Sequence, residues 1–251
     1  MEPLAWQLPA LAAVGFVSGF LNILAGGGSL LTLPLLIFLG LPATVANATN
    51  RVGILCQNLF SLGAFRRHGV LPLKLALLCT APSLLGSYLG ALWAVDIDDR
   101  LFQRLLAGIM IGVLIIILWD PAKRLQGKEM HFTPLRLAVL LVSFFFIGIY
   151  GGFVQAGVGF IIIPALLVHG FDLVRTNAVK IFVILAFTVP ALAVFVWHGQ
   201  VDWLLGLVLG VGNASGGWVA SHVAVRKGHD WIKRVVSITV LVLALKLLFG
   251  P

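Results

Sequence analysis

The stretch Asn22–Arg51, NILAGGGSLLTLPLLIFLGLPATVANATNR, decides how this chain is organised. It places three consecutive glycines, Gly26–Gly28, inside an apolar run, follows them with Pro34 and ends in a polar cluster at Arg51. Glycine disfavours a helix interior by about 1 kcal/mol relative to alanine, so three in a row favour an interruption. The stretch therefore predicts a helix that breaks at its glycines, followed by a span that carries a cation.

The composition around this stretch is that of a membrane protein. The chain has 251 residues, of which 60% are hydrophobic and 10% charged, and its mean hydropathy is +1.08. Soluble domains carry about 25% charged residues. The net charge of +8 does not indicate nucleic-acid binding, because the basic residues cluster in short loops between apolar runs, as membrane topology signals do. We predict an all-α polytopic membrane protein embedded in the lipid bilayer, with no nucleic-acid partner.

The apolar runs divide the chain into candidate spans of about 20 residues each. They lie at 8–40, 43–65, 71–95, 101–119, 135–169, 174–197, 201–225 and 231–249. The first and the fifth are too long for one simple span, and glycines interrupt both, at 25–29 and 151–159. The N-terminus carries Glu2 and no Lys or Arg within MEPLAWQLPA, so we expect the first segment to be retained rather than cleaved as a signal peptide.

The chain repeats itself at an offset of 130 residues. Without a gap, this offset pairs glycines, prolines and the dipeptides Asn-Ala and His-Gly. The pairs are Gly27 with Gly157, Pro34 with Pro164, Gly40 with Gly170, Asn47-Ala48 with Asn177-Ala178, His68-Gly69 with His198-Gly199, and Gly86 with Gly216. We predict a first transmembrane repeat at 12–119, a connecting loop at 120–135 and a second repeat at 136–249.

The loop charges favour one topology over another. If all eight runs cross once, the basic loop residues divide eight against seven, which gives no positive-inside bias. If the first and fifth runs turn back at their glycines, one side holds twelve, namely Arg66, Arg67, Lys74, Lys123, Arg124, Lys128, Arg136, Arg175, Arg226, Lys227, Lys233 and Arg234. The other side keeps Arg100, Arg104 and Lys246, together with Asp96, Asp98 and Asp99. The second topology makes the two repeats inverted, which is a recurrent design of secondary transporters.

The glycine breaks are candidate anion sites. Gly26, Gly27 and Gly28 can expose their amide N–H groups, and a helix that begins near Ser29 would add its dipole. The corresponding loop of the second repeat includes Gln155, Ala156 and Gly157. The alternative is close helix packing, which small residues permit in membranes. No Gly-Lys-Ser/Thr follows the glycines, which excludes a phosphate-binding P-loop.

Each repeat places a cation beside an asparagine about two turns into a span. Asn47, Asn50 and Arg51 share one helical face, and Asn177 shares a face with Lys180; the offset pairs Lys180 with Asn50. Charges inside membrane segments cost about 2.5–3.5 kcal/mol on insertion scales and tend to mark a site. Because no Asp or Glu lies within a span, we expect an external anion to be their partner. The alternative is that both side chains snorkel to the headgroups.

Other residues leave two interpretations open. Gln57, Asn58 and Thr188 either line a path or form helix–helix hydrogen bonds. His68 and His198 either end helices or carry a coupling proton. Cys56 and Cys79 match no metal-ligand spacing and are expected to be buried and unpaired. No paired nucleophile and base or metal cluster lies in a span, so we expect neither an enzyme nor a cofactor.

The two signature stretches, AGGGSLLTLPLLIFLGLPATVANATNR and QAGVGFIIIPALLVHGFDLVRTNAVK, closely resemble those of the sulfite exporter TauE/SafE family. The resemblance covers residues 12–249 and implies a multi-pass permease of the bacterial inner membrane for sulfite, an organosulfonate or a related oxyanion. The second copy departs from the first at Ala156 and Val158, which replace Gly26 and Gly28. We expect alternating access coupled to an ion such as a proton or sodium. An anion channel of the same fold is the alternative.

Overall fold

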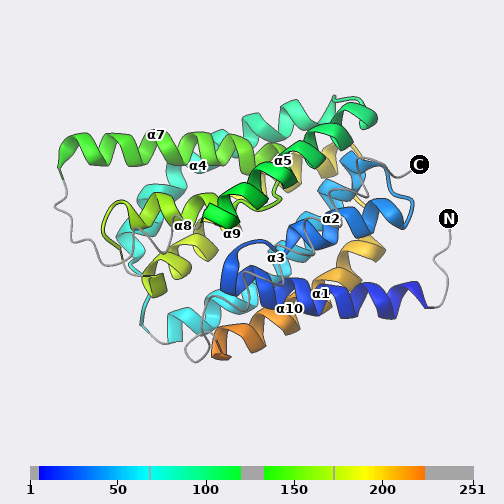
Figure 1. Ribbon diagram of the computed structural model, residues 1–251, viewed down its shortest axis with the longest axis horizontal. Helices are drawn as coiled ribbons and strands as arrows, with labels where there is room; N and C mark the ends of the chain where they lie inside the picture. Colours follow the sequence, from blue (N-terminus) through cyan, green and yellow to red (C-terminus); the bar gives the residue numbers. More distant parts are fainter. Residues whose placement is uncertain (1–5, 68, 120–132, 172, 224–251) are drawn as a thin grey trace.

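The computed structural model describes residues 6–67, 69–119, 133–171 and 173–223, and within these ranges the regular elements are helices (Figure 1). They are α1 Gln7–Ala25, α2 Ser29–Phe38, α3 Ala43–Arg67, α4 Leu73–Val95, α5 Asp99–Trp119, α7 Pro134–Phe153, α8 Gly159–Leu167, α9 Leu173–Trp197 and α10 Trp203–Val223. The expected eighth run, 231–249, and the basic residues of 120–132 and 224–251 lie outside the described residues.

Six of the helices are long and apolar enough to cross a membrane: α1, α4, α5, α7, α9 and α10. The prediction of an all-α polytopic membrane protein is therefore confirmed. The third expected span, α3, has 25 residues but is less apolar than these six helices. It carries the polar residues Asn47, Asn50, Arg51, Gln57 and Asn58. Its polar side chains are buried inside the protein instead of facing lipid.

The first and fifth runs break at their glycines, as predicted. α1 ends at Ala25 and α2 begins at Ser29, with Gly26 between them at φ 86°. α7 ends at Phe153 and α8 begins at Gly159, with Gly157 at φ 69°. Only glycine adopts such positive φ values without strain, so the sequence requires the helices to end here.

Hydrogen bonds between loops show which helix ends lie together. The Ala43 amide at the start of α3 donates to Asp99 at the start of α5. Just after α9, the Gln200 side chain donates to the carbonyl of Val95 at the end of α4, 2.9 Å away, and the amide of Asp202 donates to Thr49 of α3. Helix α3 therefore begins where α9 ends, and the two helices are antiparallel. We call this the acidic end; its residues are Asp96, Asp98, Asp99 and Asp202.

The opposite end, which we call the basic end, holds Arg66, Arg67, Lys74, Arg136 and Arg175. Helix α7 begins there because it runs parallel to α4, with Gly86 against Phe145 and Gly90 against Ile149. Nε2 of His169, just past α8, lies 3.2 Å from the carbonyl oxygen of Arg136 in the first turn of α7, so the α7–α8 hairpin returns to the end at which it started. Figure 1 shows α1 entering from the opposite end to α7.

The long helices pack as two three-helix groups. We call α1, α3 and α10 bundle I, and α7, α9 and α4 bundle II. Glycines allow the backbones to touch: Gly216 of α10 lies on the Phe16 carbonyl, and Gly206 lies against Val52 of α3. Each bundle thus combines helices from the first and second halves of the chain. The glycine pairs at 86–90, 206–210 and 212–216 thus form packing seams between the helices.

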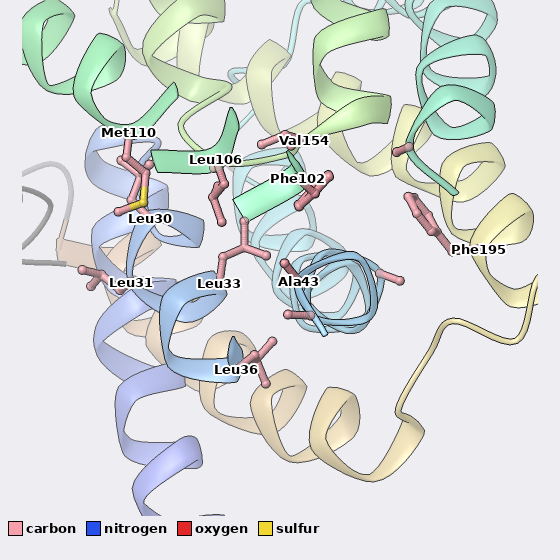
Figure 2. Close-up of a cluster of buried hydrophobic side chains, with 14 of the residues drawn as sticks. Leu30, Leu31, Leu33, Leu36, Ala43, Phe102, Leu106, Met110, Val154 and Phe195 are labelled. Carbon is pink, nitrogen blue, oxygen red and sulfur yellow. The ribbon is translucent and has the colours of Figure 1, made fainter. Parts of the chain in front are cut away.

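The short helix α2 is enclosed by apolar side chains. Figure 2 shows Leu30 and Leu33 of α2 among Phe102 and Met110 of α5, with Val154 of the second break nearby. These five residues are buried. The apolar enclosure keeps the broken helix, with its unpaired terminal groups, away from lipid, as non-helical backbone in a membrane requires.

The remaining local predictions fall on the protein's surface and helix ends. Five tryptophans near helix ends are exposed at 51–88%, as interfacial anchors are, namely Trp6, Trp93, Trp119, Trp197 and Trp203. Cys56 and Cys79 are free thiols; Cys79 is buried as expected, whereas Cys56 is only partly buried. His198 and Gly199, the latter at φ 66°, lie at the end of α9. The expected counterpart His68 lies outside the described residues.

Candidate functional site

The two glycine breaks meet inside the protein. A Cβ placed on Gly26 would lie 2.6 Å from the Cα of Gly159, and one on Gly159 would lie 2.4 Å from the Cα of Gly26. A Cβ placed on Gly27 would lie 2.4 Å from the nearest ring carbon of Phe160. The breaks of the two halves of the chain therefore form one crossing point at which no side chain fits.

The start of α2 presents amide groups at this crossing. Helix α2 begins at Ser29, as predicted, and the Gly28 amide donates to Oδ1 of Asn22 at 3.3 Å. The amides of Gly27 and Ser29 have no acceptor within the described part of the chain. In the second break, the Gly157 and Gly159 amides are likewise without an acceptor among the described residues. Free amides at helix starts, together with the helix dipole, favour an anion.

Arg51 reaches from α3 to the end of α7. Its two terminal nitrogens donate to the carbonyls of Gly151 at 2.9 Å and Gly152 at 2.6 Å. The guanidinium also lies 4.9 Å from the ring centroid of Phe195 on α9. One turn earlier, the Asn47 amide donates to the Phe153 carbonyl at 2.8 Å. Three consecutive carbonyls that end α7 thus accept hydrogen bonds from α3.

Lys180 makes the corresponding contact at the end of α1. Its ammonium lies 3.2 Å from the carbonyl oxygens of both Asn22 and Ile23. By contact, Lys180 is therefore the counterpart of Arg51, although the 130-residue offset pairs it with Asn50. Each cation comes from one half of the chain and binds the broken helix of the other half.

These contacts revise how the cations are stabilised. Sequence reasoning assigned them an external anion or the headgroups as partners. Arg51 is 0% and Lys180 1% exposed, so neither side chain snorkels to the surface. Their partners are the final carbonyls of α1 and α7, where the helix dipole contributes about half a negative charge. Each cation therefore lies at the negative end of a helix dipole and has only neutral acceptors within the described residues.

Asn50 binds α2, the short helix that follows the first break. Its amide donates to Ser29 at 3.1 Å, and its carbonyl oxygen accepts from the Thr32 hydroxyl at 2.5 Å. Asn50 thus differs from Asn47, which shares its helical face in sequence but reaches α7. The three residues Asn47, Asn50 and Arg51 hold both broken helices against α3.

The predicted residues of the second half form a second polar group. Gln155 donates to the Thr188 hydroxyl at 2.6 Å, which places Thr188 in a helix-to-break hydrogen bond. The Asn177 side chain has its Oδ1 buried and without a partner among the described residues. Gly157 packs on Val113 of α5. Gln155 and Gly157 thus belong to the second break, whereas Lys180 binds the α1 end of the first break. Conversely, Asn47 and Arg51 bind the α7 end of the second break, and Asn50 binds Ser29 and Thr32 of α2.

Sequence reasoning did not identify several partners of this site. The carbonyls at the ends of α1 and α7 have no residue-type signature, and Phe195 is one apolar residue among many. Ser18, Ser61 and Asn213 are fully buried polar residues on helices that otherwise pack through small residues. A comparison of the two halves position by position could have found Ser61 and Asn213, since their counterparts at the offset are Ala191 and Ser83.

Broken helices, capped by buried cations within a multi-pass helical protein, define a membrane protein built around a polar centre. The chain belongs to the sulfite exporter TauE/SafE family, whose model matches residues 11–247. This confirms the resemblance found in the signature stretches.

The chain is similar over its whole length to proteins named as membrane transporters. Probable membrane transporter protein ORF9 of Sinorhizobium sp is 30% identical over 257 residues, which cover 100% of this chain and 96% of the relative. Probable membrane transporter proteins of Haemophilus influenzae and of Escherichia coli K12 (YfcA) are each 27% identical, with 96% of this chain and 94% and 90% of the relatives covered. No solved structure matches the chain significantly. The family assigns the protein to membrane transporters, in accord with the expectation that it is not an enzyme.

Proposed function

We propose that this protein is a secondary transporter of a small anion, namely sulfite, an organosulfonate or a related oxyanion, in the bacterial inner membrane. The observation that carries the proposal is the crossing of the two breaks, with a buried cation bound at the end of each helix that leads into a break. Arg51 and Lys180 have no carboxylate partner within the described residues, and each bonds only to neutral acceptors.

The electrostatics of the crossing support an anionic substrate. A full charge on each cation exceeds the helix-end charge of about one half that faces it. The open amides at the starts of α2 and α8 add partial positive charge on the same region. The site in this proposal comprises Gly26–Gly28, Ser29, Asn47, Asn50, Arg51, Gln155, Gly157, Asn177 and Lys180.

Alternating access in this proposal requires two inverted repeats, 12–119 and 136–249, joined by 120–135. Their inversion is supported by the antiparallel run of α3 and α9 and by the entry of α1 and α7 from opposite ends. The helices α2, α3 and α4 begin 130 residues before α8, α9 and α10. One repeat rocking against the other would expose the crossing to each side in turn. A proton or sodium ion is the proposed coupling ion.

Uptake of radiolabelled sulfite into proteoliposomes tests this function. We expect saturable uptake that increases when unlabelled sulfite is loaded inside, since exchange through one alternating site produces such counterflow. Taurine and sulfate serve as competitors that distinguish organosulfonate from inorganic oxyanion. Uptake that does not saturate and gains nothing from internal sulfite would contradict alternating access and indicate a channel.

A further inference from the structure

Bundle I contains a set of buried polar atoms that have no hydrogen-bond partner among the described residues. Five side chains are concerned, each at most 1% exposed: Ser18 of α1, Gln57, Asn58 and Ser61 of α3, and Asn213 of α10. The unpartnered atoms are Ser18 Oγ, Gln57 Oε1, Asn58 Nδ2, Ser61 Oγ and both amide atoms of Asn213. Burying a polar group without a hydrogen bond costs free energy, so this set requires an explanation.

The groups on α3 and α10 face one another along one seam. Gly217 of α10 faces α3: a Cβ placed on it would lie 2.8 Å from Ser61 Oγ and 2.9 Å from Cγ of Gln57. One turn earlier on α10, the side-chain nitrogen of Asn213 lies 2.8 Å from the point where a Cβ on Gly53 of α3 would be. The glycines leave room for these side chains, and the polar atoms follow the helix–helix interface toward the basic end.

This seam adjoins the Lys180 centre through the last turns of α1. The Ile23 side chain lies against Gly217, and its carbonyl accepts from Lys180. A Cβ placed on Gly28 would lie 2.7 Å from Ser18 Oγ, and the backbone N–H of Gly28 donates to the Asn22 side chain. Lys180 has three N–H donors, and the two carbonyls of Asn22 and Ile23 occupy two of them.

Bundle II supplies an internal control for what packing alone requires. At the 130-residue offset, Gln57 corresponds to Phe187 and Ser61 to Ala191, both fully buried. Asn213 corresponds to Ser83, which donates to the carbonyls of Cys79 and Phe144. The same helix arrangement is thus built with apolar or satisfied side chains. A three-helix packing of this kind therefore does not by itself require unpartnered polar groups at these positions.

We propose that the seam of Ser61 and Asn213, which adjoins Ser18 and the Lys180 centre, is the anion's binding position on the basic side of the crossing. The inference rests on the proposed transport function and deepens it. Hydroxyl O–H and amide N–H groups donate to the oxygens of a sulfite or sulfonate group, and Lys180 supplies the charge. A cation is disfavoured because the Lys180 ammonium lies at the adjoining last turns of α1. Gln57 Nε2 donates to Asn58 Oδ1 at 3.4 Å, so a rotation of the Gln57 amide that presented its N–H side to the anion would give up this bond.

Charge-selective cysteine labelling tests this inference without a substrate. In a protein with Cys56 and Cys79 replaced by serine, Ser61→Cys and Asn213→Cys are compared with their counterparts Ala191→Cys and Ser83→Cys. The reagents are the anionic sulfonatoethyl and the cationic trimethylammonioethyl methanethiosulfonates. We expect Ser61→Cys to react with the anionic reagent at least about tenfold faster than with the cationic one, and faster than Ala191→Cys does.

Two labelling results would overturn the inference. Equal rates for the two reagents at Ser61→Cys would indicate a water-filled seam without preference for anions. A rate no higher than that of Ala191→Cys would indicate a closed core. Ser61→Cys changes only oxygen to sulfur and keeps the side chain's size, so it gives the result even if Asn213→Cys does not fold.

Sulfite uptake provides the second arm. The seam variants Ser61→Ala and Asn213→Ser introduce the residues found in bundle II and should raise the KM for sulfite at least about fivefold, because each removes a donor to the anion. The matched control Ser83→Ala should leave KM unchanged. If wild-type protein takes up sulfite and both seam variants keep its KM, the seam assignment is wrong while the transport function stands. If wild-type protein takes up no sulfite, the substrate assignment is wrong, and the labelling experiment still tests whether the seam admits anions.

Discussion

Gly26 of the first break and Gly159 of the second are in direct backbone contact, with 2.4–2.6 Å between the Cα of one and the Cβ position of the other. Helix α1 ends immediately before this contact and α8 begins at it, while Lys180 binds carbonyls near the end of α1 and Arg51 binds those at the end of α7. The two breaks are therefore parts of one structure, and changes at either break should affect both.

Alanine at either glycine should disrupt the crossing. Gly159→Ala places a methyl group on the Gly26 backbone, and Gly26→Ala adds strain at φ 86°. We expect each to lower the free energy of unfolding by about 2–3 kcal/mol, seen as a lower apparent midpoint of thermal unfolding in detergent. Gly112→Ala on α5 is the control, since nothing lies within 4 Å of its Cβ position. A midpoint for Gly159→Ala equal to that of Gly112→Ala would show that the contact is absent.

Asn50 should anchor α2 through both of its hydrogen bonds. Asn50→Ala removes the bonds to Ser29 and Thr32, which we expect to cost about 2–3 kcal/mol. Thr32→Val removes one of them. A double-mutant cycle between the two substitutions should give a coupling energy of about 1 kcal/mol. Strictly additive effects would mean that Asn50 and Thr32 do not interact.

Arg51 should stabilise the end of α7 independently of any anion. Arg51→Gln leaves the Gly151 and Gly152 carbonyls short of a charged donor, and we expect a loss of about 3 kcal/mol in stability without substrate. Arg51→Lys should lose about half as much, because an ammonium lacks the planar fork that reaches both carbonyls. The exposed Arg66→Gln should change stability by less than about 0.5 kcal/mol. Equal stability of Arg51→Gln and Arg66→Gln would exclude a helix-capping role.

The hairpin of α7 and α8 should place its two ends on one side of the membrane. Single cysteines at Arg67 and Val168 are expected to react with an impermeant thiol reagent from the same side, and those at Asp98 and Gln200 from the other. The positive-inside tendency predicts that the first pair is cytoplasmic. Labelling of Val168→Cys together with Asp98→Cys would instead support eight simple spans.

The glycine breaks were predictable because they depend on local backbone preference. Gly26–Gly28 interrupt an apolar run, and the structure ends α1 and starts α2 within one residue of the expected positions. The loop charges predicted that the fifth run turns back, which the contact of His169 with the Arg136 carbonyl confirms. These features follow from residue type and charge alone.

The partners of the cations were not predictable from residue types. Any residue provides a backbone carbonyl, so the contacts of Arg51 with Gly151 and of Lys180 with Asn22 depend on how the two halves pack. The repeat offset also paired Lys180 with Asn50, because the cation is displaced by one position between the halves. Tertiary packing, rather than local sequence, decides which backbone groups meet each side chain.

Sulfite flux through proteoliposomes containing Arg51→Gln or Lys180→Gln is the sharpest test of an anion site between the broken helices. Each substitution removes one of the two positive charges of the proposed anion site. We predict that Lys180→Gln raises the KM at least about tenfold, equivalent to about 1.4 kcal/mol, and that Arg51→Gln lowers flux per folded protein. Undiminished flux with unchanged KM in both variants would contradict an anion site between the broken helices.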